Sequence, residues 1–149
     1  MENKKNQLFW GMMLMFMAMT FSCNGHLSST EVDQARIQGL IFREAQESDV
    51  SVLMILMEQL GYPIEASTMM ENIQQYIQAP NHKAWVAEKH GQVVGCVAVA
   101  ITNCFHLPKS FLRVNTMIVD KEQRRSGIGK GLMSLAENYA RDQGARIWN

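Results

Sequence analysis

The stretch DKEQRRSGIGKG, residues 120–131, stands between two segments with different periodicities. Residues 111–119, FLRVNTMIV, are rich in apolar and β-branched side chains and predict a β-strand. After the stretch, apolar residues recur at three- and four-residue spacing, which predicts a helix that ends at Gly144. The buried face of this helix is expected to carry Ile128, Leu132, Leu135, Ala136 and Tyr139. The chain therefore enters a glycine-rich turn from a strand and leaves it as a helix.

This glycine-rich turn has the features of an anion-binding site. The first N–H groups of a helix have no partners inside the helix and attract negative charge. Gly127 and Gly129 have no side chains, so phosphate oxygens can approach the backbone closely. Arg124, Arg125 and Lys130 add positive charge at the same place. We interpret the turn as a diphosphate-binding loop, and a solvated basic surface turn is the alternative.

Two other glycine-rich loops do not fit this sequence. A nucleotide-binding P-loop needs Ser or Thr after its lysine, and Lys130 is followed by Gly131. The dinucleotide fingerprint needs a third glycine where Leu132 stands. That fold also needs a parallel strand after the helix, and we expect no such unit here.

The region before the turn predicts one strand, two helices and a hairpin. Residues 39–43 read as a strand and residues 47–49 as the acceptor-rich start of a helix. The first helix is expected to bury Val50, Leu53, Met57 and Leu60 and to end at Gly61 and Pro63; the second is expected to bury Met69, Ile73, Tyr76 and Ile77 and to end near Pro80.

The hairpin is expected to join residues 85–88 to residues 93–99 through His90 and Gly91. Gly95 inside the second strand suggests a bulge or the close approach of another chain segment. The order strand, two helices, three strands and a helix predicts an α/β fold with a mixed sheet rather than a repeating crossover fold.

Size and composition narrow the choice of function. The chain has 149 residues, 47% of them hydrophobic and 19% charged, which favours one domain with a real core. The net charge is zero, so we expect no nucleic-acid partner. Three cysteines do not indicate a disulfide framework, and Cys104-x-His106 without a second pair does not indicate a metal site.

The N-terminal segment stands apart from the rest of the chain. Residues 8–21, LFWGMMLMFMAMTF, follow Lys4 and Lys5 and resemble a secretory signal, but they fall short of the about 20 residues that span a membrane. The segment could anchor the chain at the inner face of a membrane, export it, or be a simple extension. We divide the chain into this segment (residues 1–24), a linker (residues 25–36) and a domain (residues 37–149). We expect a cytoplasmic catalytic domain, with membrane association and export through an N-terminal signal as alternatives.

The pattern Arg124-x-x-Gly127-x-Gly129 resembles the Q/R-x-x-G-x-G/A motif of the GNAT superfamily of N-acetyltransferases. The resemblance extends to residues 41–49, 59–63, 93–95 and 117–120, and so spans the domain from residue 37 onward. It implies the acyl-CoA N-acyltransferase fold and the transfer of an acetyl group from acetyl-CoA, as co-substrate, to an amine. The acceptor, a small molecule or a protein, is not readable, because variable helices and loops form its pocket.

The resemblance also implies roles for individual residues. The backbone of Met117, Ile118 and Val119 would pair with the pantetheine arm of acetyl-CoA, and an amide near Val119 would polarise the thioester carbonyl. The pyrophosphate would be held by residues 124–130, which are Arg124, Arg125, Ser126, Gly127, Ile128, Gly129 and Lys130.

The sequence departs from the family at two places. Asn115 stands where many relatives have a glutamate general base; Glu88 and His106 are the candidate substitutes, and the catalytic residue stays unassigned. Residues 145–149 read as the opening of a fifth strand, whereas family members continue with further strands and a helix. We therefore expect a fold that is incomplete at the C-terminus, whose exposed edge could pair with a second copy. A catalytically inactive relic and a membrane-tethered interaction module are the alternative functions.

Overall fold

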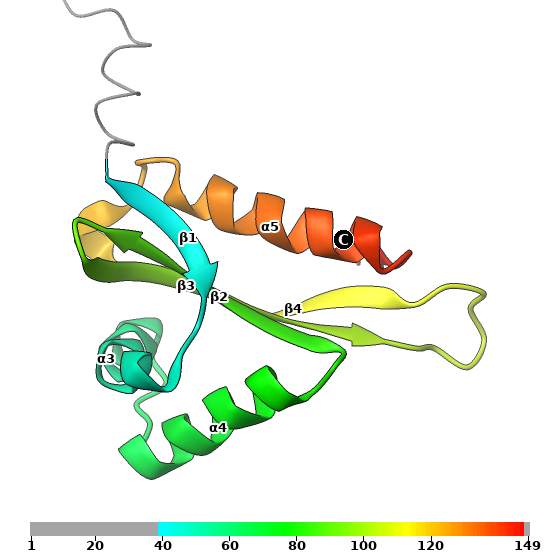
Figure 1. Ribbon diagram of the computed structural model, residues 1–149, viewed down its shortest axis with the longest axis horizontal. Helices are drawn as coiled ribbons and strands as arrows, with labels where there is room; N and C mark the ends of the chain where they lie inside the picture. Colours follow the sequence, from blue (N-terminus) through cyan, green and yellow to red (C-terminus); the bar gives the residue numbers. More distant parts are fainter. Residues whose placement is uncertain (1–38, 148–149) are drawn as a thin grey trace, which may run out of the picture. The chain divides into compact units, whose positions relative to one another are not determined.

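The computed structural model describes residues 39–147 and forms a five-stranded sheet with helices on both faces (Figure 1). The elements in chain order are β1 (Leu40–Glu44), η1 (Glu47–Asp49), α3 (Val50–Leu60), α4 (Ala66–Gln78), β2 (His82–Lys89), β3 (Gln92–Thr102), β4 (Phe111–Val119), η2 (Lys121–Gln123), α5 (Ile128–Asp142) and β5 (Arg146–Ile147). The predictions for residues 1–36 lie outside the described residues. None of the helices within residues 39–147 is long and apolar enough to cross a membrane.

The sheet is mixed, as the sequence predicts. Its strands lie in the order β1-β2-β3-β4-β5, and the first three pairings are antiparallel. The fourth is parallel, because α5 returns the chain and Phe111 of β4 pairs with Arg146 of β5. The expectation that no parallel strand would follow the helix is therefore wrong. Leu132 and the three antiparallel pairings still argue against the dinucleotide-binding fold, whose sheet is mostly parallel.

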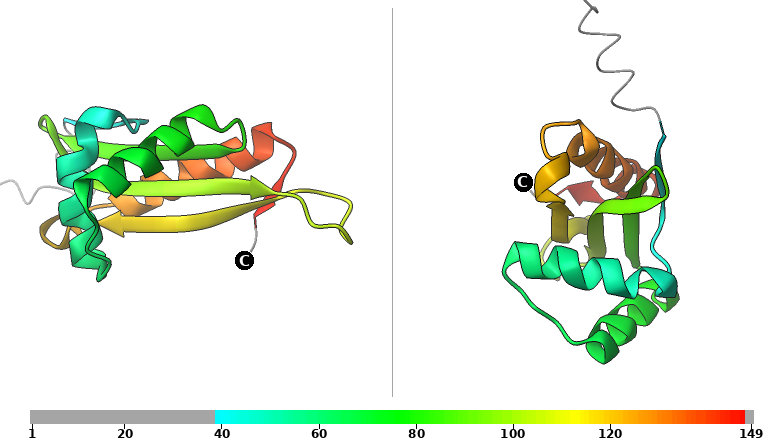
Figure 2. Two further views of the ribbon diagram at one scale, coloured as in Figure 1. Left: turned by 90° about the horizontal axis from the view of Figure 1, so that it is seen from below. Right: turned by 90° about the vertical axis from the view of Figure 1, so that its left-hand side faces the viewer.

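Each face of the sheet has its own apolar cluster (Figures 1 and 2). One cluster joins α5 to the sheet through Leu132, Ala136 and Leu112. The other joins α3 and α4 to the opposite face through Leu56 and Ile73. Burying this apolar surface, at about 25 cal/mol per Å², is the main force that holds the layers together.

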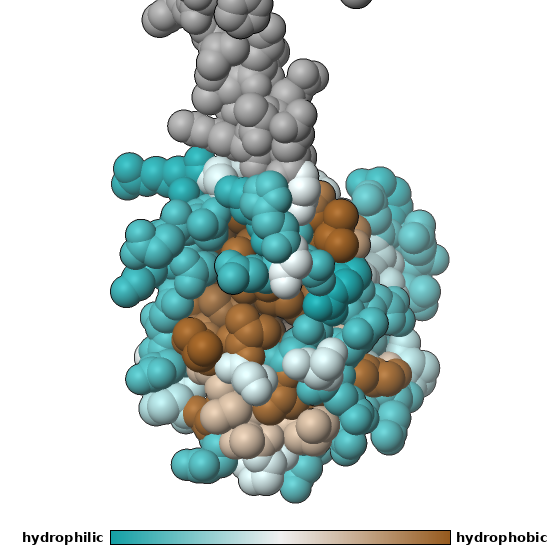
Figure 3. Space-filling model, turned by 60° about the vertical axis from the view of Figure 1, so that its left-hand side comes forward, coloured by the Kyte–Doolittle hydropathy of each residue, from teal (hydrophilic) through white to brown (hydrophobic). Residues whose placement is uncertain are grey.

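The predicted faces of α3 and α4 need correction in their last turns. In α3, Leu56 is buried, whereas Leu60 remains 38% exposed beside the helix-ending Gly61. In α4, Ile73 is buried as predicted, whereas Ile77 is 56% exposed. The spacing of apolar residues identifies the correct face of each helix. It does not show at which residue the neighbouring elements stop covering that face. Figure 3 shows one face of the molecule, on which hydrophobic side chains lie at the surface among hydrophilic ones.

The β2–β3 hairpin forms as predicted. His90 and Gly91 both have positive φ, of 51° and 79°, as a tight two-residue turn requires. The ladder pairs Ala87 with Gly95 and Glu88 with Val93, so a bulge is present at Val94, next to Gly95. A Cβ atom on Gly95 would lie 2.9 Å from the carbonyl oxygen of Ile118 on β4. Gly95 therefore marks both a bulge and a close approach of another strand.

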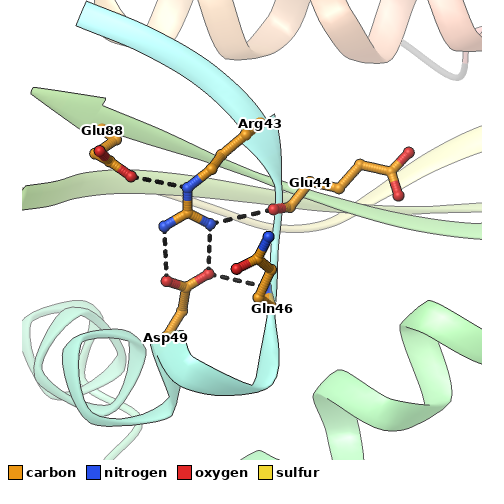
Figure 4. A network of polar contacts seen from close by, with 5 residues as sticks. All are labelled: Arg43, Glu44, Gln46, Asp49 and Glu88. Atoms are coloured by element: carbon orange, nitrogen blue, oxygen red, sulfur yellow. Dashed lines mark hydrogen bonds and ion pairs between the residues drawn. The ribbon is translucent and has the colours of Figure 1, made fainter. Parts of the chain in front are cut away.

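An ion-pair network fastens β1 to its neighbours (Figure 4). The Arg43 guanidinium donates to both carboxylate oxygens of Asp49 at 2.8 Å and to Glu88 Oε2 at 2.8 Å. Asp49 is buried, and its Oδ2 also accepts the backbone N–H of Gln46 at 2.8 Å. Burial alone would raise the pKa of Asp49, but the hydrogen bonds from Arg43 and Gln46 outweigh it and lower that pKa.

We expect Asp49→Asn to reduce stability at pH 7 by about 2 kcal/mol, because Arg43 loses its charged partner. The folded-state pKa of Asp49 lies below the about 3.9 of an unfolded aspartate. The unfolded chain therefore takes up this proton first as the pH falls, and the contribution of Asp49 is full above about pH 5 and is lost progressively as the pH falls from there through the folded-state pKa. Urea denaturation should show that the free energy of unfolding falls more between pH 7 and pH 3 in the wild type than in D49N. The exposed Glu71→Gln is the control, and an identical pH dependence in D49N would contradict the assignment.

Gly131 allows α5 to pack closely on β1. A Cβ atom at this position would lie 2.2 Å from Cζ of Phe42. We expect Gly131→Ala to force the Phe42 ring out of its place against the helix and to lower the free energy of unfolding by about 1–3 kcal/mol. Ser134→Ala, at an exposed position of the same helix, should leave the urea midpoint nearly unchanged. Equal midpoints for the two variants would rule out the close packing.

Candidate functional site

Strand β4 has one paired edge and one open edge. It pairs with β3 along its whole length, from Phe111 to Val119. On its other side, β5 pairs only with Phe111 and Leu112. Within residues 39–147, the stretch 116–119 therefore has no strand on that side. An open edge of this kind can bind an extended ligand as if it were a further strand.

The hydrogen bonds of β4 fix which backbone groups point to the open edge. The N–H of Asp120 donates to the carbonyl of Val94 at 2.8 Å. In an antiparallel ladder, hydrogen-bonded and non-hydrogen-bonded residue pairs alternate along the strands. This bond makes Asp120 part of a hydrogen-bonded pair, so Val119 belongs to a non-hydrogen-bonded pair. The N–H and C=O groups of Met117 and Val119 thus point away from β3. Those of Ile118 point towards β3.

A β-bulge at Asn115 changes which side chains face which helix. The β3–β4 ladder pairs Val114 and Thr116 but skips Asn115. Before the bulge, Leu112 and Val114 belong to the cluster under α5. After it, Ile118 belongs to the cluster under α3 and α4. The inserted residue therefore reverses the alternation of the strand, as bulges do beside many functional sites.

The turn after β4 leaves the start of α5 uncapped. Gly127 precedes the helix with a φ of 84°, and no side chain caps it. The first bond into the helix runs from the N–H of Gly131 to the carbonyl of Gly127, at 3.0 Å. The amides of Ile128, Gly129 and Lys130 come before this bond and gather at the positive end of the helix dipole. The backbone here has the geometry of an anion site.

Basic side chains surround this helix start. Arg124, Arg125 and Lys130 are all exposed. Arg125 has a φ of 62°, a conformation that costs a non-glycine residue about 1–2 kcal/mol. Arg124 Nε donates to the carbonyl of Val119 at 3.2 Å, which ties the turn to the open edge of β4. The positive charge and the strand edge therefore form one continuous site.

Two further contacts shape the turn. A Cβ on Gly129 would lie 3.3 Å from Cε of Met117, so the helix start rests directly on β4. The hydroxyl of Ser126 donates to the carbonyl of Gln123 and thereby closes the turn on itself. A Cβ on Gly127 would meet nothing within 4 Å, so the space beside its backbone is open. The structure brings the ten predicted site residues together in one place.

Helix α3 holds the beginning of the turn in position. Gln59 Nε2 donates to Asp120 Oδ2 at 2.8 Å, and Gln59 Oε1 accepts the N–H of Lys121 at 3.1 Å. The other oxygen of Asp120 accepts the N–H of Glu122 at 2.8 Å. The hydrogen bonds from Gln59 and Glu122 lower the pKa of Asp120. The carboxylate therefore stays charged and keeps η2 ordered at neutral pH.

A pocket lies on the other face of the sheet, between α3, α4, β3 and β4. Its volume is about 320 Å³, and its wall includes Met57, Met69, Tyr76 and Thr116. Cys96 also lines it, and burial raises the pKa of the Cys96 thiol to about 12. The pocket adjoins β4 at Thr116, next to the open-edge residue Met117.

The candidate bases are not brought to the open edge of β4. Glu88 is paired with Arg43 at 2.8 Å and lies on β2, with β3 between it and β4. His106 lies in the loop after β3, at the opposite end of β4 from the turn, a strand length of roughly 25 Å away. Asn115 Nδ2 donates instead to the hydroxyl of Tyr76 at 2.8 Å. Sequence reasoning assigned Tyr76 only to a helix face, and no local pattern links residues 39 positions apart.

Comparison with known proteins identifies the family. The family described as Acetyltransferase (GNAT) matches residues 50–149, which is more than half of the chain. The chain belongs to the GNAT family of acetyltransferases. This confirms the family expected from the Arg124-x-x-Gly127-x-Gly129 pattern and the mixed α/β fold expected with it. Acetyl-CoA is the general acetyl donor of GNAT enzymes.

Individual GNAT relatives match part of the chain. N-acetyltransferase 8 of Homo sapiens is 34% identical over 76 residues, covering 51% of this chain and 34% of its own length. N-acetyltransferase family 8 member 3 of Rattus norvegicus is 31% identical over 104 residues, covering 65% and 46%. The chain thus spans a third to a half of these curated relatives. The crystal structure of glucosamine-6-phosphate N-acetyltransferase from Arabidopsis thaliana shares the fold, with a TM-score of 0.67 at 16% identity over 73% of this chain and 80% of that one.

Proposed function

We propose that this GNAT chain transfers an acetyl group from acetyl-CoA to an amine, and that the open edge of β4 and the turn before α5 hold acetyl-CoA. The observation that carries the proposal is the uncapped start of α5 lying directly on that edge. A strand edge and an anion site in contact suit a molecule that joins an amide-containing arm to a pyrophosphate.

The residues of the turn divide the work of binding the pyrophosphate. The amides of Ile128, Gly129 and Lys130 can donate to phosphate oxygens at the positive end of the helix. The side chains of Arg124 and Arg125 add charge-assisted hydrogen bonds, which are stronger than neutral ones. Ser126 shapes the turn through its bond to Gln123, and Gly127 leaves the approach open.

The residues of β4 divide the work of binding the pantetheine arm. Met117 and Val119 direct their N–H and C=O groups to the open edge, two residues apart, as a paired strand requires. The backbone N–H and C=O groups of Ile118 point to β3. We therefore give Ile118 the role of keeping Met117 and Val119 at the right separation. The C=O of Val119 accepts from Arg124, and its N–H remains directed to the edge.

The chemistry assigned to this chain is positioning and electrostatic stabilisation. In the reaction, the amine nitrogen bonds to the acetyl carbon and the carbon–sulfur bond breaks. The edge-directed N–H of Met117, which lies farther from the turn than Val119 and next to Thr116, is suited to donate to the carbonyl oxygen as negative charge develops there. Neither Glu88 nor His106 lies at this edge, so we assign the proton of the amine to water rather than to a side-chain base.

Calorimetry with CoA tests the binding site directly. We expect the full chain to bind CoA, and the double variant Arg124→Glu with Lys130→Glu to bind at least tenfold more weakly, because two positive groups become repulsive to phosphate. Lys109→Glu, in the loop between β3 and β4, is the matched control and should bind normally. Equal affinity in both variants, or no CoA binding by a folded wild type, would refute the assignment.

A further inference from the structure

The pocket beneath α3 and α4 has the size of a small-molecule site. Its volume of about 320 Å³ is at the lower end of the range of about 300–1,000 Å³ for ligand pockets. At about 30 Å³ for each water-sized group, it holds on the order of ten non-hydrogen atoms. The pocket reaches β4 at Thr116, beside the edge residue Met117. An occupant can therefore bring one end to the strand where the acetyl group is expected.

The wall of the pocket is uncharged. Leu53, Met57, Met69 and Ile73 make up its apolar side, and Asp, Glu, Lys, Arg and His do not occur among its lining residues. A molecule with several ammonium groups would lose hydration here without gaining carboxylate partners, which is costly. An apolar body would instead exchange water for methionine and leucine side chains, and methionine adapts its shape to varied ligands.

Two neutral polar groups lie at the β4 end of the pocket, and Asn72 of α4 also lines it. Tyr76 and Thr116 both line the pocket. The Tyr76 oxygen accepts from Asn115 Nδ2 at 2.8 Å, and the Tyr76 ring packs edge-on against His82 at a centroid distance of 4.9 Å. These contacts fix the ring before any ligand binds, and the hydroxyl keeps its own proton for donation. The bulge that presents Asn115 to α4 also places Thr116 in this wall.

We infer that this pocket takes the acceptor, and that the acceptor is a small primary amine with a single apolar, otherwise uncharged body. The amine lies at the Thr116 and Tyr76 end, and the body lies against Met57 and Met69. The inference rests on the proposed acetyl transfer. In that transfer the amine nitrogen bonds to the acetyl carbon and loses a proton to water, the carbon–sulfur bond breaks, and the leaving CoA thiolate takes a proton from water to become the thiol.

The acceptor class is tested by comparing kcat/KM over a panel of amines with the full chain and acetyl-CoA. Phenethylamine and hexylamine represent the proposed class; ethanolamine, spermidine and the aminoglycoside kanamycin represent polar and polycationic acceptors. We expect the two apolar amines to exceed the other three by at least tenfold. Equal or higher kcat/KM for the polycations would overturn the inference.

Two variants test whether this pocket determines the preference among the amines. Ala98→Leu adds volume to the floor of the pocket next to Thr116, and should lower kcat/KM for phenethylamine at least tenfold. Met69→Glu adds a carboxylate to the wall, and should shift the preference towards spermidine. Calorimetric CoA binding equal to that of the wild type shows that each variant is folded. A preference unchanged in both folded variants would overturn the assignment of the pocket.

The two proposals fail in different ways. If the wild-type chain does not bind CoA, the acetyl-CoA site is refuted, whichever amines are acetylated. Normal CoA binding with acetylation of polycations alone refutes only the acceptor class. If CoA binds and no amine is acetylated, calorimetry of phenethylamine against the CoA-loaded chain decides the matter. Binding that Ala98→Leu abolishes supports the pocket, and absence of binding overturns it.

Discussion

The geometry of the site depends on one extra residue in β4. Asn115 has no partner in β3, and the strand resumes its pairing with its faces exchanged. Because of this exchange, Thr116 faces the pocket and Met117 faces α5. Beyond the bulge, the alternation of hydrogen-bonded pairs in the ladder directs the amides of Met117 and Val119 to the open edge. Because of this one inserted residue, the same few residues at the edge of the sheet face the pocket on one side and α5 on the other.

The turn after β4 is held from both sides of the sheet. Gln59 at the end of α3 binds Asp120 and Lys121, whereas Gly129 at the start of α5 rests on Met117. The two helices belong to separate apolar clusters, and this turn is a polar connection between them. Such support from rigid elements is what keeps backbone amides aligned before a ligand arrives.

Local patterns predicted more of the molecule than distant contacts did. The strand, turn and helix from residue 111 to residue 144 follow from periodicity and glycine placement, so they could be read directly. The bond between Asn115 and Tyr76 could not, because it joins a strand to a helix far earlier in the chain. The opening of a fifth strand at residues 145–149 was predicted, and β5 confirms it, but its parallel pairing with β4 was not expected, because that direction depends on how α5 returns the chain.

The wall of the pocket also contains a thiol that bears on the proposed acetyl transfer. Cys96 lies in that wall, and its pKa of about 12 keeps the sulfur protonated at physiological pH. A thiol in this state is a poor nucleophile, whereas a thiolate there would compete with the acceptor for the thioester. In the proposed transfer, Cys96 therefore does not compete with the acceptor amine for the thioester.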